Sequence, residues 1–400
     1  MPLDNIITGL PFVTVQKVEE GKVLKVYCRL EKPAFCPHCL SEDLRHKDTK
    51  VRRIKGITHS ETPSELHLKV PKYRCHACGK TFMQTIPGVK KYSRTSQPLK
   101  EELFSKHIKG ISQKQLAEDF RLGTASCERY VKELFDLKYK ERQNAACPKI
   151  LGIDEHRFGK GLQFATTLCD LQKHKIHDIL PGKAEQFLLQ SLLDLKDKQK
   201  VQVVVMDLSS SYKSLVRRHF PNALIVTDRF HVIRLILNAF SGIAQRLDPD
   251  LKWQRGLPKL LLKNKENLTP EQSEKLEKYF AKQPAVGNLY LFKEDLKAFL
   301  MTKTNSKKAL KKEGVIAAFV RFLQLLEETG FDLFKTLGKT LKSWGTEILH
   351  MFYLPYSNGV TEGFHRKMKL IQRRAYGFKN FENYRLRVIV LCGHLNVQGV

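Results

Sequence analysis

Two runs of β-branched and other apolar residues along the chain each end at an acidic residue. The first, Ile150–Ile153, leads into Asp154, and the second, residues 201–206, leads into Asp207. Near-continuous apolar runs of this length are typical of strands that are covered on both faces of a sheet. We therefore expect both acids where a buried strand leaves the core, solvated and able to face a ligand.

The pattern around these two strands predicts an α/β arrangement. The expected elements are strands 150–154, 162–169 and 175–179, helix 184–195, strand 201–206, helix 211–219 and strand 223–227. This order is typical of the ribonuclease-H-like fold, in which the strand before Asp207 lies beside the strand that carries Asp154. Neighbouring strands lie about 4.8 Å apart, so the two carboxylates can share a pair of divalent ions. Asp228 ends the next strand outward and is expected to be an accessory group.

A long helical stretch follows Asp207. An amphipathic pattern at residues 230–247, a strongly apolar helical pattern at 315–326, and an N-cap at Thr269 followed by proline predict an α-helical insertion in the α/β fold at about residues 235–350. Within it Trp344 is expected in the core rather than against a displaced base. The lysines of this stretch, Lys307, Lys308, Lys311 and Lys312, either grip DNA or keep the helices soluble.

A third acid, Glu362, lies in the first turn of a helix that is expected to begin at Val360. Arg366 and Lys369 fall on its face of the helix, one and two turns further on. This basic stripe can hold a DNA backbone beside metal ions. The basic run continues through Arg373 and Arg374, with aromatic residues between its members that either stack on bases or, by preference, pack against the sheet.

Carboxylates at these positions suit phosphodiester chemistry. Mg²⁺ prefers hard carboxylate oxygens, and a pair of such ions, or of Mn²⁺, can activate an attacking oxygen and stabilise a leaving one. Unpaired carboxylates held close together would repel one another unless a metal bound them. Helix capping explains a lone aspartate equally well, but it explains Asp154, Asp207 and Glu362 together poorly.

The N-terminal third carries two Cys-x-x-Cys pairs, each placed after an alternating strand. Cys36 and Cys39 form the first pair, and Cys75 and Cys78 form the second. Such pairs can place four thiolates around one structural Zn²⁺, and the long gap between them leaves room for a hairpin, so we expect a zinc ribbon. The alternative is four unrelated buried thiols.

After a polar linker, two short helices joined by a glycine-containing turn are expected near residues 112–120 and 124–134. This pattern predicts a helix-turn-helix whose second helix exposes Arg129 and Lys132 towards DNA. Any small three-helix packing unit could produce the same pattern. The preceding zinc ribbon and the positive charge of the chain favour DNA binding.

The charge of the chain indicates the class of partner. Seventy Lys and Arg residues against 41 Asp and Glu give a net charge of +29, and a phosphate backbone is the commonest partner for such a field. No apolar run is long enough to span a membrane, and the N-terminus lacks the profile of a signal peptide. We therefore expect a soluble, intracellular protein whose nine cysteines are thiols or metal ligands.

Four stretches together resemble bacterial insertion-sequence transposases with an Asp-Asp-Glu triad and an N-terminal zinc finger, the ISL-three family. They are Gly152–Glu155, Met206–Asp207, Thr227–Val232 and Ser357–Gly363. The resemblance covers nearly the whole chain in the family's order: zinc ribbon at 1–90, helix-turn-helix at 91–146 and catalytic domain at 147–400. It implies that Asp154, Asp207 and Glu362 bind the catalytic metals. It also implies recognition of terminal inverted repeats, cut-and-paste chemistry and a synaptic dimer or higher multimer, in the bacterial cytoplasm with the nucleoid.

Three other functions fit parts of the sequence. A DNA-binding regulator would need only the N-terminal modules, but it leaves the three acids unexplained. A ribonuclease-H-like nuclease without strand transfer has the same acids, and only a product joined to target DNA distinguishes it. An inactive genomic copy is disfavoured because all three acids are present.

Overall fold

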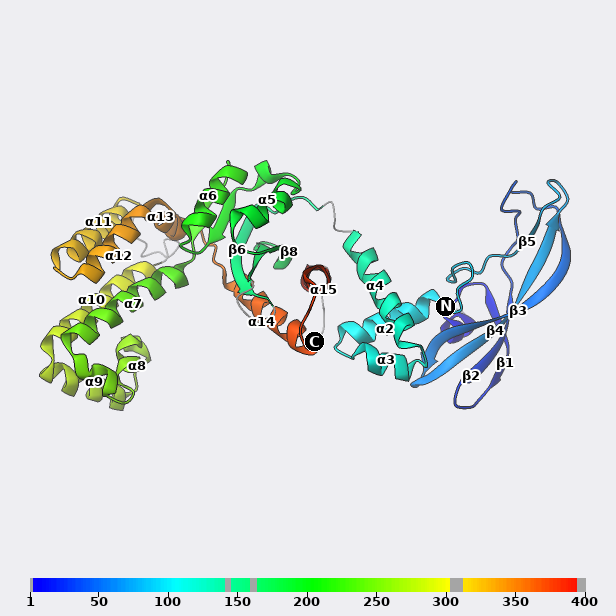
Figure 1. Ribbon diagram of the computed structural model, residues 1–400, viewed down its shortest axis with the longest axis horizontal. Helices are drawn as coiled ribbons and strands as arrows, with labels where there is room; N and C mark the ends of the chain where they lie inside the picture. Colours follow the sequence, from blue (N-terminus) through cyan, green and yellow to red (C-terminus); the bar gives the residue numbers. More distant parts are fainter. Residues whose placement is uncertain (1–2, 141–144, 159–163, 303–311, 394–400) are drawn as a thin grey trace. The chain divides into compact units, whose positions relative to one another are not determined.

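A computed structural model describes residues 3–140, 145–158, 164–302 and 312–393 of the chain (Figure 1). The chain forms two compact units. The first comprises Met1–Gln143 with Arg373–Gly377, and the second comprises Asn144–Gln372 with Phe378–Val400. Among the described residues, none of the helices combines the length and apolarity that crossing a membrane requires.

The first unit is built on a five-stranded sheet. Its order is β1-β2-β4-β3, and β5 pairs with β4. The strands are β1 (Val13–Glu19), β2 (Leu24–Leu30), β3 (Leu44–His59), β4 (Thr62–Cys75) and β5 (Thr81–Met83). β3 and β4 form the hairpin that the gap between the two cysteine pairs predicts.

The alternation of apolar residues accounts for the way this sheet packs. β2 and β4 run parallel with Val26 opposite Leu66 and Cys28 opposite Leu68, and all four side chains are fully buried. Because side chains alternate between the faces of a strand, this register places both apolar sets on one face. α1 (Leu3–Thr8) contributes Ile7 to the edge of the resulting core.

Three further helices complete the first unit: α2 (Gln97–Ile108), α3 (Gln113–Asp119) and α4 (Thr124–Lys140). Ser112 caps α3 by accepting a hydrogen bond from the Gln115 amide. The Gln115 side chain donates to Asp119 one turn further along the helix. Leu116 and Ala117 of α3 and Cys127 and Val131 of α4 are buried, as the helical spacing predicts.

The second unit contains a five-stranded sheet of order β10-β9-β6-β7-β8. Its strands are β6 (Ile150–Arg157), β7 (Phe164–Asp170), β8 (Lys175–Pro181), β9 (Val203–Met206) and β10 (Leu224–Thr227). β6, β7 and β8 are antiparallel neighbours, whereas β9 and β10 run parallel to β6. The strand before Asp207 therefore lies beside the strand that carries Asp154, as expected.

One boundary differs from the expectation. β6 does not end near Asp154 but continues to Arg157. Its pairing with β9 stops at Gly152, whereas its pairing with β7 extends to the end of the strand. Asp154 therefore lies within a strand, on the part that projects beyond β9. The local pattern did not reveal this, because one paired neighbour is sufficient to keep the backbone extended.

Helices α5 (Glu185–Leu193) and α6 (Ser210–His219) follow β8 and β9 in the chain. A largely helical segment then gathers at one end of this unit (Figure 1). It comprises α7 (Arg229–Leu247), α8 (Leu257–Leu262), α9 (Pro270–Lys282), α10 (Pro284–Met301), α11 (Lys312–Glu328), α12 (Asp332–Ser343) and α13 (Gly345–Tyr353). Trp344 is buried there, as expected. Lys307, Lys308 and Lys311 lie outside the described residues, as does the side chain of Lys312.

Two C-terminal helices return to the α/β part of the unit: α14 (Gly359–Arg374) and α15 (Phe381–Gly393). α14 begins one residue earlier than expected, and Glu362 is in its first turn. Asn358, Thr361 and Met368 are fully buried. The start of α14 is therefore fixed by packing rather than left at the surface.

Candidate active site and metal sites

The four predicted zinc ligands come together in the first unit. The sulfur atoms of Cys36, Cys39, Cys75 and Cys78 all lie within 4.8 Å of one another, with Cys36 Sγ 3.5 Å from Cys78 Sγ and Cys39 Sγ 3.5 Å from Cys75 Sγ. Tetrahedral Zn–S bonds of about 2.3 Å require sulfurs about 3.8 Å apart, so the residues fit one zinc ion. His38 and His76, which lie between the cysteines of each pair, do not belong to this group.

Asp154 and Asp207 lie on adjacent parallel strands in the second unit. Gly152 of β6 pairs with Val205 of β9, so each acid follows its paired position by two residues. Asp154 is buried on the β7 side, where it pairs in register with Thr167. The sheet register therefore brings these two carboxylates to the same edge.

Glu362 is brought to this edge by Asn358, the residue before α14. The Asn358 side chain donates a hydrogen bond to the Ile153 carbonyl of β6 (3.0 Å) and accepts one from Thr361 (3.1 Å). The Asn358 carbonyl accepts the first helical bond, from the Glu362 amide. The first turn of α14 is thereby attached to the strand next to Asp154.

The charges of the three acids influence one another. Burial, followed by the charge of Asp207 and to a smaller extent that of Glu362, raises the pKa of Asp154 to about 7. Oδ1 of Asp207 is buried and accepts no hydrogen bond of suitable geometry. Asp207 Oδ1 already has the His231 ring nitrogen 2.9 Å away, so the case for a bound cation rests on Asp154, a buried carboxyl group that resists ionisation beside other carboxylates.

The three acids do not converge on a single point. Among the described residues, only the four cysteines form a group of potential metal ligands whose donor atoms all lie within 4.8 Å of one another. The three acids do not form such a group. The carboxylate oxygens of Asp154, Asp207 and Glu362 therefore lie further apart than the ligands of a single ion. Two-metal sites use a wider set of carboxylates, with ions about 3.5–4 Å apart.

Asp228 has a supporting position behind this edge. Its Oδ2 accepts a hydrogen bond from the Asn358 amide and its Oδ1 accepts one from the Phe230 amide, both at 2.8 Å. Burial opposes ionisation, but the nearby His231 ring and the hydrogen bond from the Asn358 amide lower the pKa of Asp228. The carboxylate thus joins the end of β10 to the start of α14.

His231, which the sequence did not single out, lies between two of the acids. Its Nδ1 is 2.9 Å from Asp207 Oδ1 and 3.5 Å from Asp228 Oδ1. These contacts, with Asp207 first and Asp228 second, raise the pKa of His231 to about 10. The Asp207 contact is an ion pair whose angles are not those of a hydrogen bond. The sequence did offer one signal for this contact: His231 follows the N-cap aspartate, Asp228, by three residues, which places both in the first turn of α7.

His365 was also missed, although it lies one turn after Glu362. Its Nδ1 is 3.5 Å from Asp154 Oδ2 and its Nε2 is 3.0 Å from the Thr167 hydroxyl. Burial, followed by the charge of Lys369, lowers the pKa of His365 to about 4. His365 is therefore a ring of lowered basicity that contacts Asp154 and is held by the Thr167 hydroxyl.

A second buried histidine, His156, extends this network on the same face of β6 as Asp154, as the alternation predicts. Its Nδ1 is 2.9 Å from the Thr167 hydroxyl and its Nε2 is 2.7 Å from the Tyr384 hydroxyl. Burial lowers the pKa of His156 to about 3. Tyr384 is fully buried, so this aromatic residue of the basic run packs in the core, as preferred.

An open pocket of about 570 Å³ adjoins Asp207. Its walls include Glu155, Lys183, Tyr212, His231 and Arg234. Lys183 lies 3.8 Å from Glu155 and over the Phe164 ring. Asp207 is thus reachable by a ligand, and basic residues flank the approach.

The basic residues that were predicted to contact DNA are exposed. Arg366, Lys369, Arg373 and Arg374 are exposed at or after the middle of α14, and Arg129 and Lys132 are exposed on α4. Their exposure is compatible with contact to DNA, but these contacts stay a prediction. Of the intervening aromatics, Tyr376 is 97% exposed, whereas Phe378 and Phe381 pack against Tyr384.

Comparison with known proteins agrees with the geometry. A family model described as a transposase, of the ISL3 group, matches residues 151–388. A second model, for the zinc-finger of transposase IS204/IS1001/IS1096/IS1165, matches residues 32–78. The chain is 23% identical to the transposase for insertion sequence element IS1001 of Bordetella parapertussis, over 94% of each chain. It is 24% identical to the transposase for insertion sequence element IS1557 of Mycobacterium tuberculosis, over 61% of this chain and 60% of the relative.

Proposed function

Because this chain belongs to the ISL3 family of insertion-sequence transposases, we propose that it binds the terminal inverted repeats of a mobile DNA element, cleaves the element's ends and joins the freed 3′-hydroxyls to target DNA. One observation carries the catalytic part of this proposal. Asp154 and Asp207 lie on neighbouring parallel strands, and Asn358 attaches the first turn of the Glu362 helix to the same strand as Asp154.

The sheet order supports a ribonuclease-H-like catalytic domain at residues 147–400. Three antiparallel strands followed by two parallel strands on the other side of β6 are the arrangement expected of that fold. Asp154, Asp207 and Glu362 would hold a pair of Mg²⁺ or Mn²⁺ ions. When bound, such a pair supplies activation of the attacking oxygen and stabilisation of the leaving oxygen.

The remaining catalytic tasks belong to the chain's own residues. His365 orients the Asp154 carboxylate, and Asp228 positions the start of α14 through the Asn358 amide. In the first reaction a water oxygen bonds to phosphorus, the phosphorus–3′-oxygen bond breaks, and that oxygen takes up a proton. In the second, the 3′-hydroxyl oxygen bonds to a target phosphorus and the target's own 3′-oxygen leaves. Arg366, Lys369, Arg373 and Arg374 are proposed to hold the DNA backbone meanwhile.

Recognition of the element's ends is proposed for the first unit. α3, the glycine turn and α4 support a helix-turn-helix within residues 91–146, with Arg129 and Lys132 exposed on its second helix. The zinc ribbon at residues 1–90 would be held by one structural Zn²⁺ on the four cysteines. By its family, the protein would act in the bacterial cytoplasm at the nucleoid, as a dimer or higher multimer.

The decisive experiment compares wild type with Glu362→Gln for Mg²⁺-dependent cleavage and joining of DNA that carries the element's ends. Glu382→Gln is the matched control, since Glu382 is an exposed acid in the first turn of α15. We expect wild type and the control to cut and join, and Glu362→Gln to bind the ends but do neither. If all three proteins bind and none cuts with Mg²⁺ or Mn²⁺, the protein is a DNA-binding regulator or an inactive copy. Cutting without joining would indicate a nuclease.

A further inference from the structure

A strongly basic hollow of about 560 Å³ lies in the first unit, where the zinc-ribbon sheet meets the start of α4. Six basic residues line it: Lys55 of β3, Lys90, Lys91 and Arg94 of the connecting segment, Lys100 of α2 and Arg129 of α4. Glu133 is the one acid of its lining. We call this feature the basic hollow.

Glu133 is already neutralised at the base of the hollow. Lys100, which is buried, donates to one carboxylate oxygen at 2.9 Å, and Lys90 pairs with the other. The Lys100 ammonium also lies 4.6 Å from the centre of the Tyr130 ring, and the Tyr130 hydroxyl is 3.1 Å from that of Thr95. The base is therefore a fixed framework, and its acid is not available to the basic residues at the rim.

The rim carries positive charge that no acid in the described part of the chain neutralises. Within the described residues, Lys91, Arg94 and Arg129 take part in no ion pair with an acid. All three are exposed. Arg129 lies over the ring of Tyr130, which directs its guanidinium along the wall of the hollow. The first turn of α4 forms part of the same wall, and its helix dipole adds to the positive potential.

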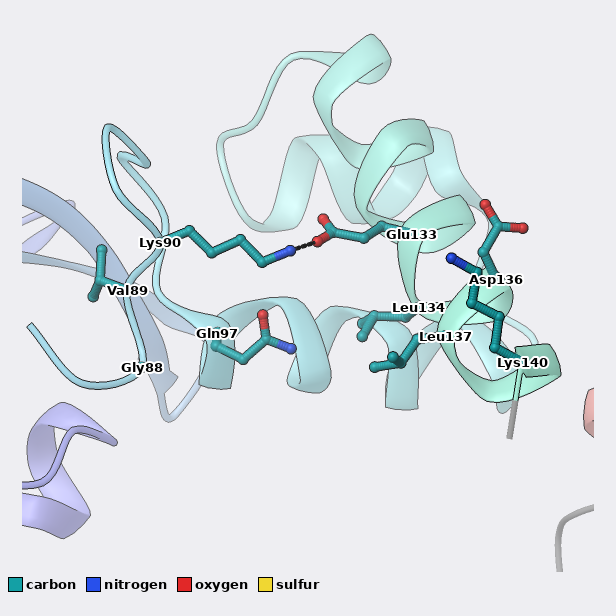
Figure 2. A pocket seen from close by; sticks show the side chains of 9 residues that line it. All are labelled: Gly88, Val89, Lys90, Gln97, Glu133, Leu134, Asp136, Leu137 and Lys140. Atoms are coloured by element: carbon teal, nitrogen blue, oxygen red, sulfur yellow. Dashed lines mark hydrogen bonds and ion pairs between the residues drawn. The ribbon is translucent and has the colours of Figure 1, made fainter. Parts of the chain in front are cut away.

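A neighbouring hollow shows that this charge is a local feature. It measures about 680 Å³ and lies on the other side of the Lys90–Glu133 pair. Figure 2 shows Lys90 reaching across this second hollow to Glu133, above the apolar side chains of Leu134 and Leu137. Its lining mixes two acids with two lysines, so it has no preference for an anion.

We propose that the basic hollow binds a backbone phosphate segment of DNA, so that the zinc-ribbon sheet and α4 hold the same stretch of duplex together. This inference rests on the proposed function. Five positive charges in excess, presented as forked guanidinium groups and ammonium groups, match the oxygens of phosphodiesters.

This proposal changes the expected role of Arg129. On a recognition helix it would read bases, but in the hollow it contacts the backbone. Lys132, three residues further along α4, does not line the hollow. Loss of Arg129 should therefore weaken binding to every DNA sequence to the same extent.

The test uses the full-length, zinc-loaded protein with Arg94→Ala, Arg129→Ala and the double variant. Lys22→Ala, at an exposed lysine of the β1–β2 turn outside the hollow, is the matched control, and Arg94→Lys retains the charge. Fluorescence anisotropy gives the affinity for a duplex carrying the element's ends and for a scrambled duplex between 50 and 200 mM salt. Zinc content and circular dichroism report whether each variant is folded.

Each lost phosphate contact should lower the slope of log K against log salt by about 0.9, and weaken binding about eightfold at 0.1 M salt. We expect a decrease of about 1.8 in slope for the double variant, equal losses on both duplexes, and no change for Lys22→Ala. An unchanged slope in a folded double variant overturns the proposal, as does a loss confined to the element ends. If wild type binds neither duplex, the proposed function itself fails.

Discussion

Gly152 of β6 has no room for a side chain, and adding one methyl group tests how Glu362 is positioned. A Cβ at residue 152 would lie 2.7 Å from Asn358 Oδ1, 2.9 Å from Thr361 Oγ1 and 2.9 Å from Leu171 Cδ2. Gly152 is not among the residues with positive φ, so alanine suits the backbone of the strand. The cost of Gly152→Ala therefore arises from these contacts alone.

The loss of stability in Gly152→Ala can be worked out from the side chains that the new methyl group displaces. Forcing one carbon into a closely packed region costs about 1–3 kcal/mol. Moving Asn358 also weakens its bonds to the Ile153 carbonyl and to Thr361, each contributing about 1 kcal/mol. We expect the free energy of unfolding of the second unit to fall by about 2–4 kcal/mol, and α14 to shift away from β6.

Urea unfolding of the second unit and Mg²⁺-dependent DNA cleavage measure the two consequences. Gly152→Ala should bind DNA as wild type does but cleave at least about tenfold more slowly, because a small misplacement of a catalytic group is costly. Gly363→Ala is the control for stability, since a Cβ there meets nothing within 4 Å. It should stabilise α14 by up to about 1 kcal/mol. Wild-type stability and cleavage in Gly152→Ala would refute this account of how Glu362 is held.

Three further predictions follow from the zinc site, the Asp228 contacts and the base of the basic hollow. Cys75→Ser should lose zinc and unfold the sheet of the first unit, which metal analysis and circular dichroism would detect; full zinc content would contradict it. Asp228→Asn presents an amide donor to the Asn358 amide, so the second unit should lose about 1–3 kcal/mol in urea and cleavage should fall with DNA binding intact. Hydrogen bonds from Lys100 and Lys90 lower the pKa of Glu133 from its ordinary value of 4.5. Its ion pairs therefore stabilise the first unit fully above pH 4.5, and this contribution is lost as pH falls through the lowered pKa. In Glu133→Gln, the loss of stability between pH 5 and about pH 3 should be smaller than in wild type when both are unfolded by urea; an equal loss would exclude this role.

Local patterns were sufficient for many of the elements and for the zinc site. Alternation in residues 24–30 and 66–70 predicted β2 and β4, and the spacing of two cysteine pairs predicted ligands that the structure brings within 4.8 Å. Both signals act over a few residues, because a strand has a period of two and a Cys-x-x-Cys turn brings its own thiols together. The order of strands and helices likewise predicted that β9 lies beside β6.

Such local patterns could not predict the contacts that shape the candidate active site. His365 meets Thr167 across 198 positions of sequence, and Asn358 meets Ile153 across 205. Single histidines and asparagines carry no periodic signal, so nothing local distinguishes these from residues at the surface. The six basic residues of the basic hollow are similarly drawn from four separate segments.

The sequence by itself determined the strands of the α/β part, which cysteines can hold zinc and which acids follow the central strands, because each depends on short-range geometry and hydrophobic periodicity. Only the tertiary structure decided that Asp154 lies within a strand, that His231 separates Asp207 from Asp228, and that the start of α14 is attached to β6. Those outcomes depend on the side-chain packing of distant segments, where displacements of an ångström or less decide which polar atoms meet.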